Sequence, residues 1–143
     1  MGQQQLLLII LGTIIVGIAI SVAVLMFNDQ ASATNRDEVV ADLAHLGSMA
    51  QAYYRKPRIL GGGGGSFTGL TLRALTSNPA NPRNLNGTYT LDPDPVGGAP
   101  SYVTIRGVGT EAGNDPSGGV NGRVTVVMLV YADSISVDET LGN

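Results

Sequence analysis

The sequence predicts an α+β protein in which one long N-terminal helix is followed by a small antiparallel β-sheet. The chain has 143 residues, and its 8 basic and 11 acidic residues all lie at or after Asp29. Apolar residues then recur at helical spacing as far as Pro57. From Phe67 onward the pattern changes to short alternating or apolar runs separated by Gly, Pro and Asn. A chain of this length has room for one domain.

Residues 6–27 form an uncharged run that is long enough to cross a membrane as a helix. Fifteen of these 22 residues are Leu, Ile, Val or Phe, and at about 1.5 Å per residue the run spans a hydrocarbon core of about 30 Å. Its insertion into a bilayer is favourable by roughly 4–9 kcal/mol. We therefore expect residues 5–27 to lie in a membrane or in the core of a filament.

Two alternatives for this run remain open. One is a helix buried in a soluble core, although the rest of the chain has few apolar residues with which to surround it. The other is a secretory signal cleaved at the small-residue site 31–33. A signal has a basic N-terminal segment and an apolar core of only about 7–15 residues, whereas residues 1–5 carry no charge.

Small residues recur every fourth position within the run, at Thr13, Gly17 and Ser21. They form a stripe along one face of a helix, and such stripes let helices approach closely where lipid or other apolar helices are the solvent. We interpret these three residues as an assembly face that packs against other copies of the chain.

Residues 35–56 continue the helix with one apolar face. The residues of this face lie three and four positions apart, while Arg36, Asp37 and Asp42 lie on other faces. Pro57 ends the helix, so residues 1–57 form one N-terminal unit. If the helix is continuous from about Gln5 to Lys56, it is about 78 Å long. A break near Asn28 or Asn35 is the alternative. The apolar face comprises Val39, Leu43, Leu46, Ala50 and Tyr53.

A glycine-rich linker, residues 58–66, follows the helix. A phosphate-binding loop would require a preceding strand and a Gly-Lys-Ser/Thr ending, and neither is present. We expect a hinge that lets the chain reverse from the helix to the sheet. Its glycines are Gly61, Gly62, Gly63, Gly64 and Gly65.

The β-rich globular head, residues 67–143, is predicted to hold about four strands. Residues 123–131 give the strongest strand, whose central apolar run indicates burial on both faces. Residues 70–72 are left open between a short strand and a turn, and the pattern of residues 73–76 is ambiguous. So small a sheet needs a cover on one face, and the apolar face of the helix supplies it. The other expected strands are 88–91, 101–108 and 134–137.

The composition argues against enzymatic chemistry. The chain has no Cys and one His, His45, which removes thiol nucleophiles, cysteine metal sites and most of the parts of a Ser/His/Asp site. We expect no enzyme, no cofactor and no resident metal. With 8 scattered basic residues and a net charge of −3, we also expect no nucleic-acid binding.

Two weaker motifs can each be explained by an ordinary turn. Asn86 begins an Asn-Gly-Thr glycosylation sequon, but Asn86-Gly87 is also a good turn. Asp92 and Asp94 have a spacing that calcium ligands use, and Asp115 and Asp133 could add oxygens, but Asp-Pro pairs are ordinary turn chemistry.

An uncharged N-terminal helix, an amphipathic continuation and a small C-terminal β head resemble the type IV pilin superfamily. The resemblance is architectural and covers the whole chain, and its motif-like part is residues 1–27. The family usually has Glu as the fifth mature residue, whereas this chain has Gln5 there if Met1 is the mature start. The resemblance implies a pilin-like fold and an assembly role for Gln5, which can accept a hydrogen bond from the N-terminal amine of a neighbouring copy.

The resemblance also implies a function. The protein is expected to be a structural subunit that leaves the membrane and polymerises with identical copies into an extracellular filament at the cell surface, supporting adhesion, motility or surface attachment. A prepilin peptidase and a pilus assembly machinery would be its partners. The alternative is a minor pilin, a pseudopilin or a single-pass membrane-anchored binding module that forms no long fibres.

Overall fold

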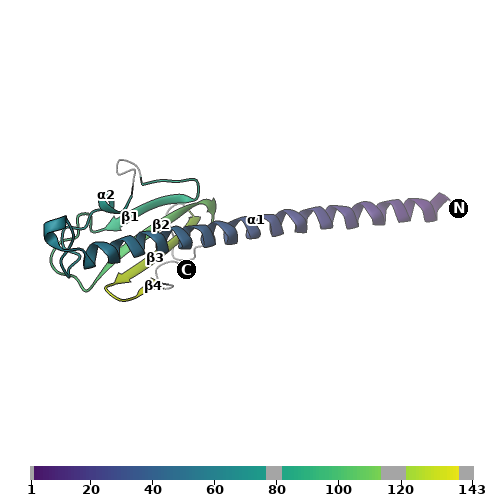
Figure 1. Ribbon diagram of the computed structural model, residues 1–143. Helices are drawn as coiled ribbons and strands as arrows, with labels where there is room; N and C mark the ends of the chain where they lie inside the picture. The colour runs from purple at the N-terminus through teal and green to yellow at the C-terminus, as the bar shows by residue number, and fades with distance from the viewer. Residues whose placement is uncertain (1, 77–81, 114–121, 139–143) are drawn as a thin grey trace.

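The computed structural model describes residues 2–76, 82–113 and 122–138 of the chain. One end of a long helix, α1, lies against a small sheet, and the rest of α1 projects away as a bare rod that ends at the N-terminus (Figure 1). We call residues 2–31 the stem and the remaining described residues the head. The α+β fold class is confirmed.

Helix α1 runs from Gly2 to Arg55 without interruption. Its 54 residues give a length of about 81 Å. Because no Pro or Gly separates the apolar half from the amphipathic half, nothing in the sequence stops the helix between them. The alternative of a break near Asn28 or Asn35 is therefore wrong.

The sheet has four antiparallel strands in the order β1-β2-β3-β4, as the alternation of short runs predicted. Consecutive strands are neighbours, so the connections are local and involve no crossover. The strand bounds are β1 (Gly87–Asp92), β2 (Tyr102–Ala112), β3 (Arg123–Tyr131) and β4 (Ile135–Asp138).

The second half of α1 covers one face of the sheet and packs mainly on β2 and β3. Val39, Leu43 and Ala50 of the predicted apolar face are fully buried there. Gly107 of β2 allows the close approach, because a Cβ at that position would lie 2.6 Å from a methyl carbon of Val39. The core of the head is therefore the interface between helix and sheet.

Strand β3 is buried on both faces, as its apolar run predicted. Val126 and Met128 belong to the core cluster that includes the helix residues, while Thr125 and Val127, which alternate with them, are also buried. This burial is typical of a central strand.

Two short helical segments connect α1 to the sheet. A 3-10 turn, η1 (Arg58–Leu60), follows Pro57, and a one-turn helix, α2 (Leu72–Leu75), lies at the position that the sequence left open between a short strand and a turn. Leu72 and Leu75 are buried. Residues 70–72 form no strand, so the strand alternative is wrong; Leu72 instead begins a helical turn whose two buried leucines are three residues apart.

Candidate assembly surface

The stem presents its apolar side chains on every face. The large apolar residues from Leu6 to Phe27 are 49–76% exposed, and the most apolar 18-residue window of α1 is 0% buried. By length and composition, α1 is the one helix in the described part of the chain that could cross a membrane. Because this apolar window is not buried by any other part of the described chain, the alternative of a helix buried in the core of this chain is wrong.

Thr13, Gly17 and Ser21 lie on the exposed stem, and the helix geometry places them within one narrow face. The Thr13 hydroxyl donates to the Ile10 carbonyl at 2.8 Å, and the Ser21 hydroxyl donates to the Gly17 carbonyl at 2.9 Å. Both hydroxyl protons are thus used within the helix. The stripe can therefore bring a neighbouring helix close, but its hydroxyl groups do not donate hydrogen bonds to that helix.

Gln5 is also exposed on the stem, one turn from the end of the described helix. The structure brings it near none of the stripe residues, because Thr13 lies eight residues further along the same straight helix. Gln5 and the stripe can act together only through other copies.

Asn35 joins α1 to the sheet where the helix leaves the head. It is 4% exposed. Its amide nitrogen donates to the Asn86 carbonyl at 2.9 Å, and its amide oxygen accepts from the backbone nitrogens of Thr110 at 3.1 Å and Glu111 at 3.3 Å. Gly109 makes room for it, because a Cβ there would lie 2.1 Å from the Asn35 oxygen. The side chain was predicted as a possible helix cap, and it is instead a buried clamp within a continuous helix.

Asp42 is the centre of a second polar network on α1. Its Oδ2 accepts hydrogen bonds from the Tyr89 hydroxyl at 2.5 Å, the Asn84 amide at 2.7 Å and the Asn86 amide at 2.9 Å. Partial burial by itself raises the pKa of the Asp42 carboxyl, but these hydrogen bonds, with a smaller contribution from the His45 charge, outweigh burial and lower the pKa. Burial and the bond to Asp42 raise the pKa of the Tyr89 phenol. The network fixes the segment before β1 against the helix.

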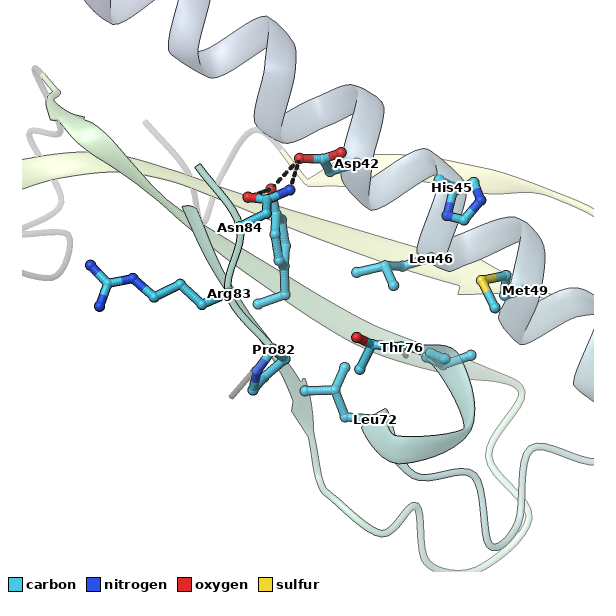
Figure 2. A pocket seen from close by; sticks show the side chains of 11 residues that line it. Asp42, His45, Leu46, Met49, Leu72, Thr76, Pro82, Arg83 and Asn84 are labelled. Carbon is cyan, nitrogen blue, oxygen red and sulfur yellow. Dashed lines mark hydrogen bonds between the residues drawn. The ribbon is translucent and has the colours of Figure 1, made fainter. Parts of the chain in front are cut away.

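A groove of about 220 Å³ lies between α1, α2 and the segment before β1. Figure 2 shows Leu46, Met49 and Leu72 lining its apolar part, with the Asp42–Asn84 hydrogen bond at one end and the Arg83 side chain directed away. The Asp42 acceptor is already shared by three donors. Leucine and methionine side chains thus line one part of the groove, and the Asp42 network lines the other.

The glycine run forms a hydrogen-bonded turn over the C-terminal end of α1. The backbone nitrogens of Gly63 and Gly65 donate to the Tyr53 and Tyr54 carbonyls, both at 2.8 Å. Gly64 has a φ of +59°, a conformation that favours glycine. These bonds satisfy carbonyls that the end of a helix leaves unpaired. The chain reverses here as expected, and the turn also holds η1 at the far end of the head.

The two weaker motifs fall in structured parts of the head. Asn86 is half-buried, and its amide nitrogen already donates to Asp42. Asn84 accepts from the backbone nitrogens of Asn86 and Gly87, so a hydrogen-bonded turn precedes β1 and Gly87 is the first residue of that strand. Asp94 lies against the Leu72 backbone nitrogen, and Asp115 lies outside the described residues. Across residues 2–76, 82–113 and 122–138, no three His, Asp or Glu side chains group as metal ligands.

Sequence reasoning missed Asn35, Asp42 and Asn84 as the polar residues that attach the sheet to the helix. For the first two, the sequence was ambiguous. Both lie on the helix beside the apolar face, where a polar residue exposed to solvent cannot be distinguished from one that bonds to the sheet. Gly107 and Gly109 of β2, which lie against the helix, were the matching indication in the sheet.

Comparison of the chain with protein-family models, with curated proteins and with solved structures found no match.

Proposed function

We propose that this protein is a pilin-like structural subunit whose stems bundle with those of identical copies to form a filament. The single observation that carries the proposal is the stem, in which a long run of apolar side chains is exposed on every face. A surface of this size does not remain in contact with water. It requires an apolar environment all round, which either a bilayer or several neighbouring helices supply.

The continuity of α1 supports a filament. The stem and the head share one uninterrupted helix, and the Asn35 clamp fixes the sheet at the point where the helix leaves it. When stems bundle, each head is carried at a defined distance from the bundle. Contacts between unlike faces of identical subunits generate open helical fibres. We infer an extracellular filament formed from a membrane-inserted precursor, with assembly machinery as partners.

The second candidate is a membrane-anchored binding module or a minor subunit that forms no long fibres. The groove between α1 and α2 favours it, because an apolar hollow with a polar edge suits a small partner. Electron microscopy of material sheared from cells, with the protein identified by mass spectrometry, separates the two. Abundant uniform fibres of this chain support the filament, and protein found only in membranes supports the anchored module.

A pair of glycine substitutions tests the assembly stripe. Gly17 lies in the stripe, whereas Gly12 lies about 140° around the helix from it, and a Cβ at either position meets nothing within its own chain. Both Gly→Leu changes strengthen the isolated helix. We expect Gly17→Leu to lower fibre yield about tenfold or more, since overpacking a close helix contact costs about 1–3 kcal/mol per contact, and Gly12→Leu to have a much smaller effect.

Gln5 provides a comparison within the same assay. It can accept a hydrogen bond but carries no charge, so we expect Gln5→Ala to lower fibre yield less than Gly17→Leu does. A loss as severe as that caused by Gly17→Leu would contradict the view that apolar packing sets the register of the stems.

A further inference from the structure

The far end of the head carries an exposed basic and apolar surface, which we call the tip. It consists of the last residues of α1 and the turn η1, and Ile59 is 94% and Leu60 63% exposed. The turn is held in place, because the Leu60 nitrogen donates to the Pro57 carbonyl at 3.0 Å and the Gly61 nitrogen donates to the Arg58 carbonyl at 2.9 Å. The tip comprises Arg55, Lys56, Arg58, Ile59 and Leu60, all of them exposed.

At the opposite end of the head, around the point where the stem joins it, lies an exposed acidic and apolar surface, which we call the shoulder. Two hollows adjoin α1 where it leaves the sheet, and Glu111 lines both. The described residues that line them include three acidic side chains and no basic one; Arg36 and Arg123, at the same end, line neither. Leu85, at 94% exposure, and Phe27, at 76%, supply the apolar part. The shoulder has two flanks on opposite sides of α1, because Asp29 and Glu38 are nine residues apart on the helix. Phe27, Glu38 and Leu85 lie on one flank, Asp29 lies on the other, and Glu111 adjoins both.

The tip and the shoulder cannot meet within one copy. Lys56 follows Glu38 by 18 residues along a continuous helix, which separates them by about 27 Å, and it follows Asp29 by about 40 Å. Their charges are opposite, and each surface presents at least one apolar side chain that is almost fully exposed. Each surface thus has the chemistry that complements the other.

We propose that, in the fibre, the tip of one copy docks against the shoulder of the next copy. This inference rests on the filament proposed above and adds the contact between heads. Because the two surfaces differ, the contact is heterologous and does not close, so it continues from copy to copy in one direction. All stems then point the same way, and successive heads along a stack are offset by about 27–40 Å, the separation of the two surfaces along α1.

The single lysine of the sequence permits a direct test on the unaltered protein. A carbodiimide joins an amine to a carboxylate without a spacer, so it links only groups in contact. Sheared fibres are treated with a carbodiimide, digested and analysed by mass spectrometry. We expect Lys56 to be joined to Glu38, Glu111 or Asp29. Glu111 lies beside Asn35, about 31 Å before Lys56 along α1. Any of these links must therefore run between two copies, because all three carboxylates are too far from Lys56 within one copy.

The outcomes separate this inference from the filament itself. Fibres in which Lys56 is joined to none of these three carboxylates overturn the docking of tip on shoulder and leave the filament standing. The absence of fibres overturns both. Lys56→Arg is the matched control, because it keeps the charge and removes the amine: fibres should persist and the links should disappear.

Two serine substitutions test the apolar part of the contact. Ile59 and Leu85 are each 94% exposed, so Ile59→Ser and Leu85→Ser should leave the melting temperature of the detergent-solubilised protein unchanged. We expect each to lower fibre yield about tenfold. Fibre yield unchanged by both substitutions would overturn the contact.

Discussion

The two halves of α1 are one helix in two environments. In the stem, apolar side chains surround the axis and all of them are exposed. In the head, apolar residues occupy one face and are buried against β2 and β3. The first half contributes nothing to the stability of the isolated chain, and the second half contributes much of the core. The number of apolar residues in a helix segment therefore does not show whether the segment stabilises its own domain. The arrangement of those residues around the helix axis does show it.

The difference between the two halves is tested most sharply by the same Leu→Ala substitution in each half. Leu43 is 0% and Leu11 54% exposed. We expect Leu43→Ala to lower the free energy of unfolding of the head by about 2–5 kcal/mol, because it leaves a cavity between helix and sheet. Leu11→Ala should leave it within about 0.5 kcal/mol. Thermal or denaturant unfolding in detergent measures both, and equal effects would show that the halves are not distinct.

The boundary between the halves is tested with two asparagines. Asn35→Ala removes the amide that pairs with Asn86, Thr110 and Glu111, and we expect a loss of about 2–3 kcal/mol because three hydrogen bonds of a buried side chain are lost. The exposed Asn28 is the matched control, and Asn28→Ala should cost less than about 0.5 kcal/mol. An Asn35→Ala variant as stable as the control would show that the sheet is not clamped at this point.

The smallest expected effect is the acid sensitivity of the head. Because the folded pKa of Asp42 is lowered, its contribution is complete above the unfolded pKa of about 3.9 and is lost as the pH falls through the folded pKa. We expect Asp42→Asn to cost about 1 kcal/mol at pH 7, with the difference from wild type shrinking toward pH 3. The exposed Asp37→Asn is the control, and a difference that grows in acid would contradict the assignment.

The sequence predicted the fold class and most of the elements because these depend on local patterns. The uncharged run, the spacing of Val39, Leu43 and Ala50, the alternation in β2 and the apolar run of β3 are all patterns of residues that are neighbours along the chain. The candidate stripe was also readable, since it is a property of one helix.

What the sequence could not predict depends on residues far apart in the chain. The Asn35 clamp requires that Gly109 and Thr110 lie beside the helix, and the Asp42 network requires Tyr89 and Asn84. Likewise, the opposition of tip and shoulder exists only once α1 is known to be straight. The positions of the charged residues in the sequence do not show that the tip and the shoulder lie at opposite ends of the head.

A three-dimensional reconstruction of the fibres by cryo-electron microscopy tests the central claim most directly. The account predicts that residues 6–27 are present in the fibre and lie at its axis, with each stem surrounded by stems of other copies and the heads on the outside. Fibres whose subunits lack this segment, or in which the stems lie apart from one another, would contradict it.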